Sequence, residues 1–305
     1  MSEPDNERRR ADGVLLAVIA FTLWGCFPLY FYQLRDVSPL VTLAFRAIFT
    51  TPLLIPVVLL RGKGPALAAI FRQPKKLGIL CATTFLIAAN WGLFIWLVSR
   101  NLTLMSSLAN YMTPLISVSL GAIFLRERLT RASACSVALV VAAVCVYSAG
   151  LGRVPWEAIL TAGFFSVYSL LRKVADVDST AALCVETMFF TPPALLFLIW
   201  AVRNLPPTAA TLQTPLLLAL LVGSGLLTAI PLLLFGSAAC RIRLMTLGMI
   251  QYITPSLQFL CAVCFLHEKM AFFQWVSFFI VWIALALFSA ASIERHHHHQ
   301  EWGAH

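Results

Sequence analysis

Two ionisable residues lie within long apolar runs of the sequence, Arg46 in the run 38–60 and Glu186 in the run 181–202. A charge inside a lipid bilayer costs at least about 2.5–3.5 kcal/mol, so such a residue normally faces the interior of the protein. An arginine there can bind an anionic group, and a glutamate can bind an amine or carry a proton. We predict that the two side chains form opposite poles of a central cavity for a small molecule. The alternative is that each pairs with another residue and only holds the helices together.

Amide and aromatic side chains in neighbouring runs are expected to line the same cavity, since such groups are poorly suited to face lipid. They are Asn90, Trp91, Asn110, Tyr111, Gln251 and Tyr252. Pro114 and Pro255 follow the two tyrosines, and each removes a backbone hydrogen bond, which predicts a kink that can serve as a hinge. For Asn90, a hydrogen bond that joins two helices is an equally good explanation.

The elements that must position these residues are membrane-spanning helices. Of the 305 residues, 60% are hydrophobic and 11% are charged, with a mean hydropathy of +0.86, which excludes a soluble domain with a polar surface. A helix needs roughly 20 apolar residues to cross the hydrocarbon core. The apolar runs of suitable length are 13–34, 38–60, 77–98, 103–125, 132–150, 155–171, 181–202, 215–239, 245–266 and 271–291. They predict an all-α membrane protein with ten transmembrane helices.

The sequence contains an internal repeat. Sliding the chain by 141 residues aligns Tyr111-Met112-Thr113-Pro114 with Tyr252-Ile253-Thr254-Pro255, and Phe124-Leu125-x-Glu127 with Phe265-Leu266-x-Glu268. The neighbouring offset of 140 aligns Phe49-x-Thr51-Pro52 with Phe189-x-Thr191-Pro192, and it relates Arg46 to Glu186. Each copy holds five spans, an odd number, so the second copy must enter the membrane from the opposite side.

We therefore predict two inverted five-helix repeats, 13–150 and 151–291, between an N-terminal segment 1–12 and a His-rich tail 292–305. Inversion places Arg46 toward the outer half of the membrane and Glu186 toward the inner half. Their offset along the membrane normal is about 10 Å, given a hydrocarbon core of about 30 Å. This offset argues against a tight ion pair between the two.

The basic residues predict the orientation. With the N-terminus in the cytoplasm, sixteen of the 22 lysine and arginine residues fall on the cytoplasmic side and five on the outer side. The positive-inside rule then places both termini in the cytoplasm. The net charge of +9 is explained by these basic loops next to anionic lipid, so we expect no nucleic-acid partner.

Several stretches spread over nearly all of residues 13–291 are those of a known family. They are Gly13-Val-Leu-Leu-Ala17, Trp24-Gly25, Asn90-Trp91-x-Leu93-Phe94-Ile95-Trp96, Phe124-Leu-x-Glu127-Arg128, Glu186-Thr187-Met188, Pro231-Leu232-Leu233, Arg241-Ile-Arg243-Leu244-x-Thr246-Leu247-Gly248 and Gln251-Tyr252-Ile253-x-Pro255. With them the chain resembles the drug/metabolite transporter superfamily with two EamA repeats, and more closely its RarD branch of chloramphenicol-sensitive proteins. The resemblance implies the ten-helix fold, the bacterial inner membrane, and export or exchange of small metabolites or drugs, with no particular substrate.

The main hypothesis is a secondary transporter, a permease that works by alternating access with or without proton coupling. A passive facilitator or channel would share the fold and need no coupling ion. A membrane-embedded enzyme is disfavoured, because the predicted spans contain no Asp, His or Lys for a catalytic set. We expect no cofactor and no metal, and either a monomer or a homodimer.

Some polar residues are assigned to structure instead of function. Glu127 and Glu268 end the fourth and ninth spans at the level of the lipid headgroups, where a structural role is favoured. The pair Cys261 and Cys264 lies in a predicted span without further ligands, so both are interpreted as apolar packing residues. The histidines of the tail are excluded from function.

Overall fold

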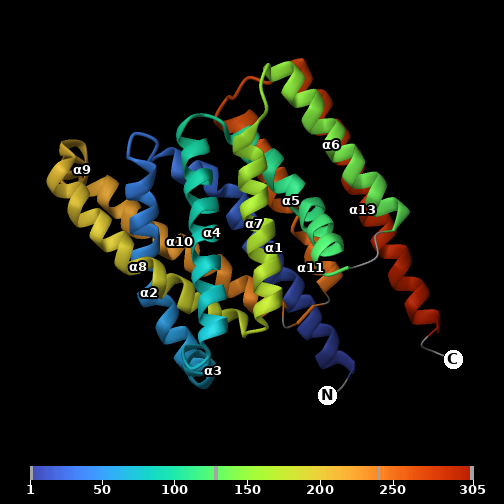
Figure 1. Cartoon of the computed structure of the whole chain (residues 1–305), viewed down its shortest axis with the longest axis horizontal. Helices are drawn as coiled ribbons and strands as arrows, with labels where there is room; N and C mark the ends of the chain where they lie inside the picture. Colours follow the sequence, from blue (N-terminus) through green and yellow to red (C-terminus); the bar gives the residue numbers. More distant parts are fainter. Residues whose placement is uncertain (1–2, 127–129, 240, 243, 303–305) are drawn as a thin grey trace.

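The computed structural model describes residues 3–126, 130–239, 241–242 and 244–302. Within these residues, ten helical segments are long and apolar enough to cross a membrane, which confirms the ten predicted spans (Figure 1). The spanning elements are α1 (Glu3–Tyr32), α2 (Pro39–Leu60), α4 (Pro74–Ser99), α5 (Thr103–Phe124), α6 (Arg131–Leu151), α7 (Trp156–Ala175), α8 (Ser179–Asn204), α10 (Pro215–Ala239), the group α11 (Leu244–Ile250), α12 (Ile253–Leu260) and η1 (Cys261–Phe265), and α13 (Phe272–Trp302). The short helices α3 (Gly64–Phe71) and α9 (Pro206–Leu212) connect spans. Glu127, Arg128 and His305 lie outside the described residues.

Helices α1, α7 and α13 extend past the predicted spans, and α1 begins at Glu3, within the predicted N-terminal segment 1–12. Helix α7 continues to Ala175, past the predicted end at residue 171, so that Arg172 and Lys173 form its last turn. Cations are favourable there because the carbonyl end of a helix carries a partial negative charge. Helix α13 continues to Trp302, through most of the predicted tail 292–305.

An even number of spans brings both chain ends to one end of the bundle, here called the terminal end. Helix α3 follows the second span and lies at the same end, whereas α9 lies at the opposite end (Figure 1). At the terminal end, α8 begins after Asp178, whose carboxylate accepts hydrogen bonds from the amides of Thr180 and Ala181 at 3.1 and 3.0 Å. The same carboxylate pairs with Lys63 at 2.8 Å, which joins the start of α3 to the start of α8.

The two repeats are inverted and meet along equivalent helices. Helix α2 packs on α8, α5 on α12, and α6 on α13, and each of these pairs joins equivalent spans of the two repeats. Figure 1 shows α6 and α13 side by side at one edge of the bundle. The hydroxyls of Thr51 and Thr191 lie 2.8 Å apart, and these residues are 140 positions apart in the chain. Repeat-equivalent residues touch only near the two-fold axis that relates the repeats, so this contact locates the axis between α2 and α8.

The first helix of each repeat packs against the other repeat. Helix α1 contacts α10 and α12 of the second half, and α7 contacts α4 and α5 of the first half. Small residues permit close helix contacts elsewhere: a Cβ atom on Gly225 of α10 would lie 2.6 Å from the backbone carbonyl carbon of Phe49 on α2. Such close approach is how membrane helices gain packing energy without a hydrophobic driving force. The exchange of α1 and α7 interlocks the halves around a central space.

The fourth and ninth spans differ although both contain the Tyr-x-Thr-Pro motif. Helix α5 is continuous through Pro114. The ninth span is interrupted between α11 and α12 at Gln251 and Tyr252, and it ends in the π-helical turn η1. Pro255 has no N–H to donate to the carbonyl of Gln251, so the interruption lies where the proline removes a helical hydrogen bond.

Candidate functional site

A cavity of about 980 Å³ lies between the two halves. This volume is at the upper end of the usual range for small-molecule sites. Its walls come from both repeats, and they include the terminal-end residues Arg61, Lys63, Asp178 and Arg241. Three of these four are exposed to solvent, so the cavity opens at the terminal end.

The opposite end of the cavity is closed by apolar packing. Phe27, Phe31 and Leu34 of the first span and its loop pack against Phe94 of α4 and Leu221 of α10, and all five are buried. None of the described residues in the opposite-end segments 33–38, 100–102 and 205–214 lines the cavity. The site is therefore reached from one end only.

Glu268 holds two spans together at this closed end. Its carboxylate accepts hydrogen bonds from the backbone amides of Thr103 at 2.6 Å and Leu104 at 3.0 Å, the first residues of α5. Burial raises the pKa of the Glu268 carboxyl above its usual value, and the bonds from the Leu104 and Thr103 amides oppose that rise. The contact fits the structural role predicted for Glu268. Its repeat equivalent Glu127 lies outside the described residues.

Arg46 lines the cavity and lies among aromatic rings. Its guanidinium carbon lies 4.0 Å from the ring centre of Trp91 and 5.6 Å from those of Phe27 and Phe31. The residue is 3% exposed, and its Nε has no hydrogen-bond partner. Within the described part of the chain, no carboxylate lies within ion-pair distance of it. Cation–π contacts with aromatic faces are therefore the stabilising interactions that the protein provides for this charge.

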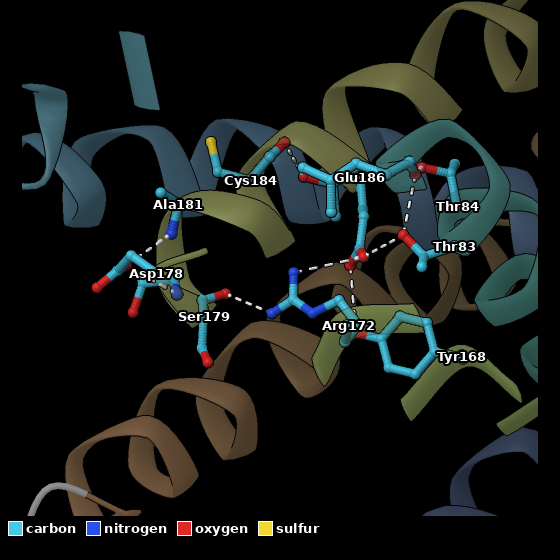
Figure 2. Close-up of polar contacts among 12 residues, drawn as sticks. Thr83, Thr84, Tyr168, Arg172, Asp178, Ser179, Ala181, Cys184 and Glu186 are labelled. Carbon is cyan, nitrogen blue, oxygen red and sulfur yellow. Dashed lines mark hydrogen bonds and ion pairs between the residues drawn. The ribbon is translucent and has the colours of Figure 1, made fainter. Parts of the chain in front are cut away.

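Glu186 has the opposite surroundings, as Figure 2 shows. Its carboxylate accepts hydrogen bonds from the hydroxyl of Thr83 at 2.7 Å and the hydroxyl of Tyr168 at 3.2 Å, and it pairs with Arg172 at 3.4 Å. Arg172 also donates to the backbone oxygen of Ser179 at 3.0 Å. Glu186 is 2% exposed and does not line the cavity, whereas Tyr168 and Arg172 do. The carboxylate is thus neutralised behind the cavity wall.

The two predicted poles lie at different levels of the bundle. Arg46 is level with Trp91 on α4, and Glu186 is level with Thr83 on the same helix. Eight residues of helix separate Thr83 from Trp91, which corresponds to about 12 Å at 1.5 Å per residue. This separation agrees with the offset expected from the inverted repeat, and the ion-pair partner of Glu186 is Arg172, not Arg46.

The predicted amides lie in the cavity wall and bond to other helices. Asn90 donates to the backbone oxygen of Thr161 on α7 at 2.8 Å. Asn110 donates to the side-chain oxygen of Gln258 on α12 at 2.7 Å. Both amides therefore join the two halves as well as lining the cavity.

The remaining predicted residues are divided between two cavities. Trp91, Gln251, Tyr252, Pro114 and Pro255 line the central cavity. Tyr111 does not line it. The Tyr111 hydroxyl lies 2.8 Å from that of Ser256, and its side chain borders a second cavity of about 520 Å³ beside α12 and α13.

Residues that the sequence interpretation missed also line the central cavity. Arg172 was placed in a loop because the apolar run of the sixth span ends at residue 171, although Tyr168 lies one helical turn before it. Gln258 lies seven residues after Gln251 and three after Pro255, the spacing of one helical face, which is a signal that could have identified it.

Comparison with known proteins agrees with this architecture. A sequence model of the EamA-like transporter family matches residues 11–149. An uncharacterized transporter of Vibrio cholerae is 38% identical over 96% of this chain and 97% of its own length. Protein RarD of Escherichia coli is 36% identical over 92% of this chain and 95% of its own length. A crystal structure of another protein has a TM-score of 0.59 at 20% identity, covers 92% of this chain and 96% of that one, and supports the fold alone.

The relatives extend over both repeats, so the resemblance is not confined to one half. The ten apolar helices independently make the chain a multi-pass membrane protein. On both grounds, the chain belongs to the EamA-like transporter family of the drug/metabolite transporter superfamily, with RarD proteins among its relatives.

Proposed function

We propose that this protein is a secondary transporter that exports or exchanges a small metabolite or drug by alternating access. The observation that supports this most is the cavity between inverted halves, open at the terminal end and closed by apolar packing at the other. Inverted repeats with a site near their interface are the plan of many secondary transporters. Two similar halves can exchange conformations, which would open the same site to the other side.

The terminal end is proposed to face the cytoplasm of a bacterium, on the basis of the positive-inside rule. In this orientation the cavity is open inward, and the Glu268 contact lies at the outer end. Arg46, Asn90, Trp91, Asn110, Gln251 and Tyr252 are the proposed substrate contacts in the central cavity. Tyr111 is kept as a more distant candidate, and Pro114 and Pro255 as candidate hinges. The functional unit is a monomer or a homodimer.

Glu186 is the proposed proton carrier if transport is coupled to protons. It is buried, and its partner Arg172 lines the cavity, so a change in the Glu186 charge can reach the substrate site through one side chain. A passive facilitator would use the same cavity without this step. The two possibilities differ in their response to a pH gradient.

The transport function is tested with the purified full chain in liposomes loaded with a bacterial metabolite extract. We expect a subset of compounds to leave faster than from protein-free liposomes, and Arg46→Ala and Glu186→Gln to insert normally but abolish this efflux. If no compound leaves faster than from protein-free liposomes, the transport function is wrong. If both variants transport like the parent, the assignment of these two residues is wrong.

Coupling is tested by counterflow with and without a pH gradient. Proton coupling predicts that the gradient changes the rate in the parent, whereas Glu186→Gln shows no transport with or without the gradient. A parent rate that is indifferent to the gradient, and unaltered by Glu186→Gln, contradicts proton coupling and favours a facilitator.

A further inference from the structure

We propose that the substrate is an organic anion, with an oxyanion group that binds Arg46 and an apolar body that packs on the aromatic wall beside it. This inference rests on the proposed transport function and names its substrate class. In this site Arg46 is the single charged pole, in place of the two poles of opposite charge, Arg46 and Glu186, that the sequence predicts.

The Arg46 side chain has hydrogen-bond donors that the described residues leave unused. A guanidinium has five N–H donors. Among the described residues, none of the hydrogen bonds and ion pairs involves the Arg46 side chain, although the residue is 97% buried on a cavity wall. The rings of Phe27, Phe31 and Trp91 lie at cation–π distance from the guanidinium carbon, and no acceptor among the described residues bonds to the N–H groups along the edge of the guanidinium. An oxyanion is the group whose geometry matches that free planar edge.

Cationic side chains outnumber acidic ones in the described part of the cavity wall. Besides Arg46, the described residues of this wall include Arg61, Lys63, Arg172 and Arg241, but only one acidic residue, Asp178. Asp178 pairs with Lys63 and caps α8. Lys63 and the amides of Ala181 and Thr180 outweigh its burial and hold the pKa of Asp178 below its usual value, so it is ionised at neutral pH.

Among the described residues, Lys63 is paired with Asp178 and Arg172 with Glu186, which leaves Arg61 and Arg241 at the opening and Arg46 at the far end as cavity cations without an acidic partner. Arg61 and Arg241 at the opening bond to the hydroxyl and the backbone oxygen of Ser237, both uncharged partners. Glu186 does not neutralise the charge of Arg46. Its carboxylate lies nearer the terminal end, where Thr83 and Tyr168 donate hydrogen bonds to it and Arg172 forms its ion pair. A cavity with an excess of one sign of charge raises the local concentration of the opposite ion and repels amines.

The cavity wall between Arg46 and the opening is rich in aromatic rings. Aromatic side chains line the cavity in two groups, Phe27, Trp91 and Phe94 beside Arg46, and Phe21, Trp24 and Phe235 nearer the opening. In the second group, the Trp24 ring centre lies 5.4 Å from that of Phe21 and 5.7 Å from that of Phe235, so apolar rings also line the path from the opening toward Arg46. An inorganic anion would leave these rings uncovered. A carboxylate or phosphate ester with an apolar body satisfies both the cation and the rings.

Three probes that share one skeleton test the proposal: 3-phenylpropionate, 3-phenylpropanamide and 3-phenylpropylamine. Their dissociation constants are measured by thermal-shift titration of the purified full chain. We expect the acid to bind at least about tenfold tighter than the amide, as one charge-assisted bidentate contact provides, and the amine to bind weakest. Tighter binding of the amine, or no binding of any probe, overturns the proposal.

Variants assign the preference to Arg46. In Arg46→Gln the acid and the amide should bind within about twofold of each other, because the charge-assisted contact is lost. Arg46→Lys keeps the charge and should retain part of the preference. Arg203→Gln, an exposed residue at the opposite end, should bind like the parent. If Arg46→Gln does not fold, a preference that is reduced but not lost in Arg46→Lys, with an intact melting profile, supports the assignment. An unchanged preference in a folded Arg46 variant overturns it.

The efflux experiment separates this inference from the transport function. If compounds leave the loaded liposomes and organic anions are prominent among them, both stand. If only neutral or cationic compounds leave, transport stands and the anion assignment is wrong.

Discussion

Arg46 on α2 and Glu186 on α8 occupy equivalent positions of the two repeats and are equally buried, but the protein meets their charges differently. Glu186 has two hydroxyl donors and an ion-pair partner, whereas Arg46 has aromatic faces and no acceptor among the described residues. A repeat fixes where a side chain emerges, but the neighbours decide whether its charge is neutralised within the protein or left available for a ligand.

The largest expected effect comes from Arg172→Met, which leaves the buried carboxylate of Glu186 without its cation. Removing one partner of a buried pair costs several kcal/mol, and we expect about 3 kcal/mol of lost stability because Thr83 and Tyr168 remain. Thermal melts of the purified variant measure the loss. The double variant Arg172→Met with Glu186→Leu should recover most of it, since both charges are then gone. A single variant as stable as the parent would show that the pair does not matter.

The next effect concerns the closed end of the cavity. Glu268→Ala leaves the amides of Thr103 and Leu104 without their acceptor, and loss of such a helix cap costs about 1–2 kcal/mol. The melting temperature should fall. The neighbouring exposed residue provides a matched control, Lys269→Ala, which should melt like the parent. Equal melting temperatures of Glu268→Ala and Lys269→Ala would show that Glu268 does not stabilise the closed end.

A smaller effect of opposite sign is expected for Arg46→Met. The desolvation penalty of a buried unpaired charge is several kcal/mol, and cation–π contacts return about 2 kcal/mol of it, so removal should stabilise the protein by about 1 kcal/mol. Opposite shifts in melting temperature for Arg46→Met and Arg172→Met distinguish the two positions. A clear loss of stability in Arg46→Met would mean that groups of the protein compensate the charge of Arg46.

The smallest effect is expected five residues further along the same two helices, where the repeats are alike. Thr51→Val and Thr191→Val each remove one side of the hydroxyl pair, and hydrogen bonds between membrane helices are worth about 0.6 kcal/mol on average. The two single variants should melt alike, and the double variant should lose little more than either. Unequal single variants would indicate that the pair is not equivalent by symmetry.

The spans and their inversion could be predicted from sequence because the pattern that encodes them is local. Ten apolar runs and one repeated motif place Arg46 and Glu186 at matching positions without any tertiary information. The resulting expectation that the two lie at different levels agrees with their separate neighbours on α4.

The partners of these residues could not be predicted in the same way. Arg172 follows the apolar run of the sixth span, and hydropathy assigns a charge at such a place to a loop, although the helix continues to Ala175. The Tyr-x-Thr-Pro motif is identical in both repeats, yet only the ninth span is interrupted. Both motif helices pack on the equivalent first helix of the other repeat, α12 on α1 and α5 on α7, so neither the motif nor this contact determines which span is interrupted.

The most direct test of the contrast is ligand binding to Arg46→Met and Glu186→Gln, measured as the rise in melting temperature that 3-phenylpropionate produces. Binding at equilibrium needs the free cation but not the neutralised carboxylate. We predict that the rise persists in Glu186→Gln and disappears in Arg46→Met. A rise that persists in Arg46→Met and disappears in Glu186→Gln would contradict the account.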